Sequence, residues 1–300
     1  MTGFARTYNH LVPINNLGKL RRYAGCCYFR DKVTGLLTLS QNSFTEKTVK
    51  QFGVNAGRNT PLSTDAFVEE FDEDEPDGVW PFRELVGSLM WLANQTRPDI
   101  SNAVRAVARF AHAPKHKHWK AARGILEYLK VTSDYGATFQ RGTSLELLVY
   151  ADAAYAPKET KRKSVSGGGV MWGGVAIQWI SRTQTCTTLS SSEAEYVAEG
   201  FTEALFLRSV WRFLLPDFGD PCIQVFEDNK GATQLAVNPV TNSNSKHIDV
   251  RHHFLREHVE NGEFEISHVQ SKYQRADFLT KPLVKYAFRF DRNFKMNMTS

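Results

Sequence analysis

The sequence of 300 residues lacks the features of a membrane-spanning or secreted protein. It contains no run of eighteen apolar residues, so we expect no transmembrane helix. The N-terminal stretch "MTGFARTYNHLVPINN" has no apolar segment of the kind found in signal peptides. The four cysteines (Cys26, Cys27, Cys186 and Cys222) have neither a metal-binding spacing nor an obvious disulfide framework. These absences argue against a membrane partner and a zinc site, and they favour an intracellular protein.

A nucleotide-binding phosphate loop is also missing. No G-x-x-x-x-G-K-[ST] motif occurs, and the glycines of "SGGGVMWGG" are more typical of a hairpin than of a phosphate cradle.

Acidic residues are scarce in the first half of the chain, apart from one run. Residues 1–68 carry nine basic and three acidic side chains, and residues 78–144 carry ten and four. Between them, "EEFDEDEPD" at 69–77 adds seven acids. Residues 145–285 carry fifteen basic and seventeen acidic side chains. A basic first half suits a polyanionic partner, although solvated surfaces would explain the charges equally well.

The chain divides into five segments. Residues 1–53 predict a β-hairpin and a short helix, and residues 54–80 predict an acidic linker. Residues 81–131 predict three helices, the first two of which begin with proline. Residues 136–285 alternate strands and helices, and residues 286–300 form a basic tail. The predicted fold class is α/β: a mixed sheet with helices on its faces, preceded by a hairpin and a helical region.

Four carboxylates fall at the ends of predicted elements in the α/β segment. Asp152 ends an apolar strand, Glu195 lies near the start of a long helix, Asp228 ends a later strand and Asp277 opens a late helix. The three aspartates also have ordinary explanations: Asp152 could form a turn, Asp228 could cap a helix and Asp277 could interact with a helix dipole. Near Glu195, Glu193 is explained by a capping box.

Convergent carboxylates repel one another unless cations neutralise them. Oxygen-only ligands select hard cations such as Mg²⁺. Two such ions about 4 Å apart can activate a water and stabilise the leaving oxygen of a phosphodiester. The acids therefore indicate metal-assisted hydrolysis of nucleic acid, with two Mg²⁺ ions or with Mn²⁺ in their place.

Six motifs identify a family, and they occur in the family's order. They are "RELVGSLMWLANQTRPDISNAV", "HWKAARGILEYLK", "LSSSEAEYVA", "EDNKGA", "SKHIDVRHHFLREHV" and "ADFLTKPL". Across nearly its whole length the chain resembles the C-terminal part of copia-type LTR retrotransposon Pol polyproteins. The resemblance implies the end of a reverse transcriptase followed by a ribonuclease H domain. Residues 1–53 would then be a trailing palm and thumb remnant, 81–131 a thumb or connection region, and 136–285 a ribonuclease H-like domain.

The family's Asp-Glu-Asp-Asp set maps onto Asp152, Glu195, Asp228 and Asp277 as catalytic and metal-binding residues. The chain departs from related sequences in two ways. Ala154 stands where many members have a second acid, and "QSKYQR" lacks the histidine that many cellular ribonucleases H carry before the last aspartate. The paired aspartates of the polymerase are also absent from this chain, so reverse transcriptase activity is not expected of it.

Basic side chains supply candidate contacts to a nucleic-acid backbone. We expect such contacts from Lys115, Lys117, Lys120, Arg123, Lys246 and Arg251.

The predicted function is a metal-dependent endoribonuclease that cuts the RNA strand of RNA–DNA hybrids. The alternative is a catalytically inactive nucleic-acid-binding remnant of a mobile element. The expected partners are the hybrid and the rest of a polyprotein. The expected location is cytoplasmic, with a virus-like particle or the nucleus left open.

Overall fold

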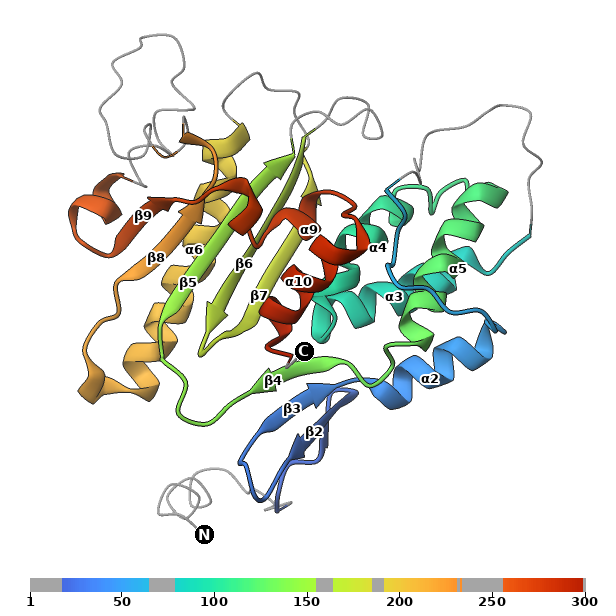
Figure 1. The fold of residues 1–300 in the computed structure, drawn as a ribbon, viewed down its shortest axis with the longest axis horizontal. Coiled ribbons are helices and arrows are strands. Elements are labelled where there is room, and N and C mark those ends of the chain that lie inside the picture. The colour runs from blue at the N-terminus through green and yellow to red at the C-terminus, as the bar shows by residue number, and fades with distance from the viewer. Residues whose placement is uncertain are drawn as a thin grey trace, which may run out of the picture.

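The computed structural model describes residues 18–64, 79–154, 164–184, 192–230, 233 and 256–298, and of 192–202 it describes the backbone alone. Figure 1 shows two sheets and a group of helices, which together form two parts. The two parts pack directly on each other and share buried side chains. Among the described residues, no helix combines the length and the apolar content that crossing a membrane requires.

The first part contains a small sheet and four α-helices. Its strands pair antiparallel in the order β1-β2-β3-β4. The elements are β1 (Arg22–Tyr23), β2 (Cys26–Arg30), β3 (Leu37–Ser40), α2 (Asn42–Gln51), α3 (Phe82–Gln95), the 3₁₀ turn η1 (Pro98–Ile100), α4 (Ser101–Ala108), α5 (His116–Lys130) and β4 (Gly136–Phe139).

The three helices predicted between residues 81 and 131 are confirmed as α3, α4 and α5. Their apolar stripes form one core around Leu85, Leu89, Ile125 and Leu129, all fully buried. Pro98 opens η1, as a proline at a first helical turn should. Residues 136–139 were predicted to open the α/β segment, but as β4 they pair with β3.

The second part is a five-stranded mixed sheet in the order β7-β6-β5-β8-β9. Strands β5, β6 and β7 run antiparallel, whereas β8 and β9 run parallel to β5. The elements are β5 (Leu147–Ala154), β6 (Val165–Trp172), β7 (Val175–Thr183), α6 (Ser192–Leu214), η3 (Pro216–Phe218), β8 (Ile223–Glu227), β9 (Phe264–His268), η4 (Ser271–Tyr273), α9 (Asp277–Thr280) and α10 (Lys285–Met296). This sheet, with helices on both faces, is the α/β architecture that the sequence predicts.

Two buried clusters hold the helices against this sheet. On one face, Val149 and Val225 pack with Ala204 of α6. On the other face, Tyr150 packs with Ala276 and with Phe294 of α10. The alternating direction of side chains along β5 therefore gives each face its own core.

The glycines of "SGGGVMWGG" have two different roles. Gly173 and Gly174 form the predicted two-residue turn between β6 and β7, and both have positive φ, 61° and 80°. Gly167 lies within β6, where a Cβ would stand 2.7 Å from Leu279 Cβ and 2.6 Å from Thr280 Cγ2. The missing side chain of Gly167 thus allows α9 to lie directly on the sheet.

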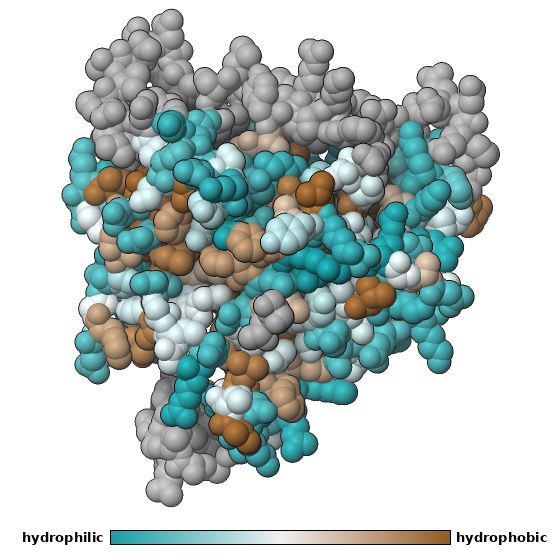
Figure 2. Space-filling view, viewed as in Figure 1, coloured by the Kyte–Doolittle hydropathy of each residue, from teal (hydrophilic) through white to brown (hydrophobic). Residues whose placement is uncertain are grey.

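The C-terminal segment predicted as a basic tail contains most of α10, which contacts β7, β4 and η1. Phe288 and Met296 of this helix are buried. Hydrophobic and hydrophilic side chains are interspersed over the face of the molecule seen in Figure 2.

Candidate metal centre

Three of the four predicted acids converge at one end of the mixed sheet. One carboxylate oxygen from each of Asp152, Asp228 and Asp277 lies within 4.8 Å of the other two. Asp152 is on β5, Asp228 directly follows β8 and Asp277 is the first residue of α9. Asp228 and Asp277 thus stand where the sequence predicts, at the end of a strand and the start of a helix, whereas Asp152 lies two residues before the end of its strand.

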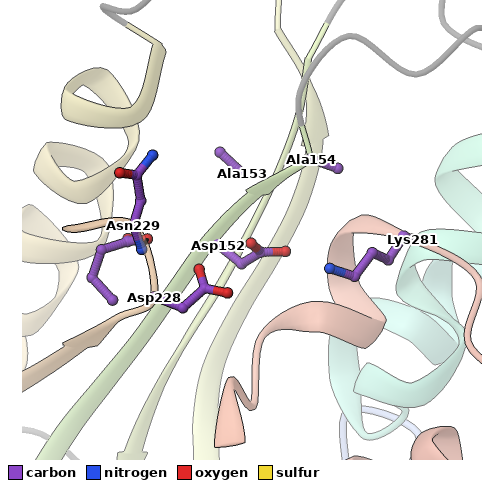
Figure 3. A pocket seen from close by; sticks show the side chains of 7 residues that line it. Asp152, Ala153, Ala154, Asp228, Asn229 and Lys281 are labelled. Carbon is purple, nitrogen blue, oxygen red and sulfur yellow. Dashed lines mark hydrogen bonds between the residues drawn. The ribbon is translucent and has the colours of Figure 1, made fainter. Parts of the chain in front are cut away.

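The register of β5 and β8 explains why two of these acids meet. Tyr150 pairs with Phe226 in parallel register, so Asp152 and Asp228 come two residues later on neighbouring strands and on the same face. The rings of Tyr150 and Phe226 stack with centroids 4.9 Å apart immediately below the acids. Figure 3 shows the two carboxylates next to each other.

The third acid is brought in by the packing of α9 on the sheet. Asp152 pairs with Gly167, the glycine over which α9 passes. Thr280 Oγ1 donates a hydrogen bond to Asp152 Oδ2, and Ser181 Oγ donates one of 2.6 Å to the carbonyl of Leu279. These two bonds tie α9 to β5 and β7.

Gln274 fixes the loop that precedes α9. It is 1% exposed, and its Nε2 donates a hydrogen bond of 2.7 Å to the carbonyl of Ala151. Its Oε1 accepts one of 3.1 Å from the backbone N–H of Ala276. Sequence reasoning gave Gln274 no role, because a buried glutamine in a loop has no motif of its own.

Two of the three aspartates, Asp152 and Asp228, line a cleft of about 380 Å³. Asp152 is buried, whereas Asp228 and Asp277 are partly exposed. The described residues that line the cleft are Asp152, Ala153, Ala154, Glu227, Asp228, Asn229 and Lys281. A solute can therefore reach the carboxylates from one side.

The electrostatics of the cleft disfavour three negative charges. Burial and the neighbouring carboxylate of Asp152 raise the pKa of Asp277 from its ordinary 3.8 to about 7. Burial also raises the pKa of Asp152, and neither Lys281 nor the hydrogen bond from Thr280 cancels that effect. Burial alone would lower the pKa of Lys281, but Asp152 and Asp277 outweigh it, so the pKa of Lys281 is raised. The cleft therefore favours a further positive charge.

The donor set fits a hard divalent cation. All the convergent ligand atoms are carboxylate oxygens, which suit Mg²⁺ or Mn²⁺ and not a thiolate- or imidazole-preferring metal. Asp152, Asp228 and Asp277 would hold the ions, and their unbalanced charge is the feature that a bound cation would relieve.

The fourth predicted acid, Glu195, lies in α6, but its side chain is outside the described residues. Figure 1 shows that α6 crosses the back of the sheet and begins at the end where β5 terminates. The start of α6 is therefore at the same end of the sheet as the three aspartates.

Two neighbours of the acids were missed by sequence reasoning. Lys281 forms an ion pair of 2.9 Å with Asp277, and helical i,i+4 spacing could have revealed it. The predicted absence of a histidine applies to residues 270–275, but His268 precedes them at the end of β9. Its Nε2 lies 3.1 Å from the carbonyl oxygen of Asp228.

The predicted backbone contacts on α5 cluster at its N-terminal half. Lys120 is exposed, while Lys115, Lys117 and Arg123 are partly buried. Arg123 also donates a hydrogen bond of 3.3 Å to the carbonyl of Gly53. The remaining two predicted contacts, Lys246 and Arg251, lie outside the described residues.

Sequence comparison finds relatives among transposon proteins. The chain is 37% identical over 232 residues to the retrovirus-related Pol polyprotein from transposon RE2 of Arabidopsis thaliana, covering 77% of this chain and 16% of that protein. It is 32% identical over 287 residues to the one from transposon TNT 1-94 of Nicotiana tabacum, covering 92% of this chain and 21% of that protein. No family model matches the chain.

Among solved structures, RNase H1 from Halobacterium salinarum matches at 19% identity with a TM-score of 0.33, covering 45% of this chain and 94% of that one. The chain spans about a sixth to a fifth of the length of the two Pol polyproteins. The chain is thus a homologue of the retrovirus-related Pol polyproteins of transposons.

Proposed function

We propose that the chain is the C-terminal part of a copia-type retrotransposon Pol polyprotein and a metal-dependent endoribonuclease that cuts the RNA strand of RNA–DNA hybrids. The observation that carries the proposal is the convergence of Asp152, Asp228 and Asp277 within 4.8 Å, at a cleft that the first two of them line. The sheet order, the transposon relatives and the oxygen-only donor set all support the same activity.

Each acid has a distinct contribution to the site. Asp152, held by Thr280, and Asp228, held by the sheet register, would ligate both ions. Glu195 and Asp277 would complete the ligand set. When bound, divalent cations supply Lewis acidity to a phosphodiester and lower the pKa of a coordinated water. Asp152 on β5 and Asp228 directly after β8 would position the cations, and through them a substrate phosphate.

Substrate selection would depend on duplex shape. The 2′-hydroxyls of the RNA strand distinguish it from DNA in the minor groove, and the basic side chains of α5 would contact the phosphate backbone. Such contacts are independent of base sequence. We propose action in the cytoplasm, within a virus-like particle or as part of the longer polyprotein.

Cleavage of labelled substrates by the purified chain tests the proposal. An RNA–DNA hybrid, duplex RNA and duplex DNA are each incubated with Mg²⁺ or with EDTA. We expect the RNA strand of the hybrid alone to be cut, and only with Mg²⁺. A folded protein that binds the hybrid in Mg²⁺ and leaves it intact would instead be the inactive remnant that the sequence left open.

A further inference from the structure

Lys281 places a positively charged side chain of the protein itself at the cleft. Of the described residues that line the cleft, two are aspartates, one is glutamate and Lys281 carries the only positive charge. Figure 3 shows its ammonium group reaching from the end of α9 toward the carboxylate of Asp152. Its Nζ lies 2.9 Å from Asp277 Oδ1.

Two consecutive residues at the end of α9 contact different aspartates of the site. Thr280 donates to Asp152, and Lys281 pairs with Asp277 one helical turn earlier. The backbone N–H of Lys281 also donates a hydrogen bond of 3.0 Å to the carbonyl of Asp277. The base of the lysine is therefore fixed, while its flexible four-carbon stem carries the charge into the cleft.

The Lys281 and Asp277 side chains differ in how far they are exposed to solvent. The side chain of Asp277 is 15% exposed, whereas that of Lys281 is 43% exposed. A lysine ammonium is a single point charge without the bidentate fork of arginine, so it can exchange its partner for solvent or phosphate without breaking a planar pair. Asp277 is the more buried member of the pair, and the ammonium is the one that solvent can reach.

We propose that Lys281 is a displaceable counter-ion of the three-aspartate site, one that balances the carboxylates in the absence of metal and competes with divalent cations for Asp277. The inference rests on the proposed metal-dependent function and deepens it. Lys281 is a positioning residue in this scheme, because it acts through the aspartates. The Lys281 ammonium and a divalent ion are attracted to the same carboxylates, so each weakens the interaction of the other with them.

Titration of the full chain with Mn²⁺ by calorimetry, without nucleic acid, tests this proposal. Lys281→Met removes the charge and keeps an unbranched stem of similar size. We expect this variant to bind Mn²⁺ about fivefold more tightly than the wild type, which is the effect of losing one partly exposed ion pair. The matched control is Lys285→Met, an exposed lysine four residues later and outside the cleft, which should bind like the wild type.

A second variant keeps the test decisive if Lys281→Met does not fold, as judged by circular dichroism. Lys281→Arg retains the charge and can form a more persistent pair with Asp277, so it should bind Mn²⁺ no more tightly than the wild type. Equal or weaker Mn²⁺ affinity in Lys281→Met, or tighter affinity in Lys281→Arg, would overturn the proposal.

The titration separates this proposal from the nuclease activity. Tighter Mn²⁺ binding by Lys281→Met without cleavage of any hybrid would support the counter-ion role and refute the nuclease. Unchanged affinity in Lys281→Met together with Mg²⁺-dependent cleavage would refute the counter-ion role alone. If neither the wild type nor Lys281→Met binds Mn²⁺, both proposals fail together.

Discussion

Two clusters of charged side chains, one around Asp99 in the helical part and one at the three aspartates of the mixed sheet, differ in how far positive charges and hydrogen-bond donors offset their carboxylates. In the helical part, buried Arg97 donates two hydrogen bonds to Asp99, of 2.9 and 2.7 Å, and two more to Thr132. Tyr128 donates a hydrogen bond of 2.6 Å to Asp99, and Arg292 of α10 approaches the Tyr128 hydroxyl at 3.3 Å. Every carboxylate oxygen there has a partner.

The carboxylates of the mixed sheet are in the opposite situation. Three aspartates share one lysine, and the pKa of Asp277 is raised to about 7. In the helical cluster, burial alone would raise the pKa of Asp99, but the Arg97 guanidinium outweighs it and lowers that pKa. The comparison teaches that the balanced cluster serves the fold, while the unbalanced one is available to a ligand.

We expect the largest effect from removing one carboxylate of the three-aspartate cluster. Asp228→Asn should reduce hybrid cleavage by more than about 100-fold, because it removes one ligand of the metal site. Binding of the hybrid, measured by fluorescence anisotropy, should persist. Asp217→Asn, an exposed aspartate in η3, is the control and should cut like the wild type. Cleavage by Asp228→Asn at the wild-type rate would remove the aspartates from the mechanism.

Breaking the balanced cluster should affect stability instead. Asp99→Ala leaves the buried Arg97 guanidinium uncompensated, which should lower the free energy of unfolding by about 3–5 kcal/mol. Urea denaturation of this variant and of the surface variant Asp217→Ala measures the difference, and the surface change should stay within about 0.5 kcal/mol. Equal stability of the two variants would contradict the contrast between the clusters.

The pH dependence of stability sharpens the same contrast. The folded protein keeps the proton of Asp277 up to about pH 7, whereas an unfolded chain releases it near pH 3.8. The folded state therefore binds more protons between these values, and this group makes the free energy of unfolding fall as the pH rises across the window.

Denaturation in EDTA at pH 5 and pH 7 checks the direction. Asp277→Asn should lose part of the pH dependence that the wild type shows. If both proteins respond identically to pH, the pKa of Asp277 is not raised in the folded protein.

The smallest expected effect concerns the nucleic-acid backbone. Lys120→Ala removes an exposed charge on α5 and should weaken hybrid binding uniformly across base sequences. The slope of log affinity against log salt should fall by about 0.9 if one phosphate contact is lost. Lys47→Ala, an exposed lysine on α2 outside the predicted set, provides the comparison. An unchanged slope in Lys120→Ala would exclude that contact.

Sequence patterns were sufficient for the local features of this fold. Opening prolines predicted α3 and α4, apolar spacing predicted α5, and paired glycines predicted the turn at Gly173 and Gly174. Asp152, Asp228 and Asp277 could be proposed because each falls at the end of a predicted element and matches a family motif. Their convergence could not be derived from one sequence, because it depends on the parallel register of β5 and β8.

The supporting contacts of the site are non-local and had no sequence signal. Gln274 bonds to Ala151, 123 positions earlier, and Thr280 bonds to Asp152, 128 positions earlier. The pairing of β4 with β3 was missed for the same reason, since four α-helices and the turn η1 separate the two strands along the chain. The role of Gly167 required knowledge of which helix lies over β6.

The central claim is that the unbalanced aspartates are the catalytic centre of an RNA–DNA hybrid nuclease. A time course with both strands of one hybrid labelled, using wild type and Asp152→Asn at equal hybrid occupancy in Mg²⁺, tests it most directly. The account predicts that the wild type cuts the RNA strand alone and that Asp152→Asn binds without cutting. An intact RNA strand with bound wild type, or equal cutting by Asp152→Asn, would contradict it.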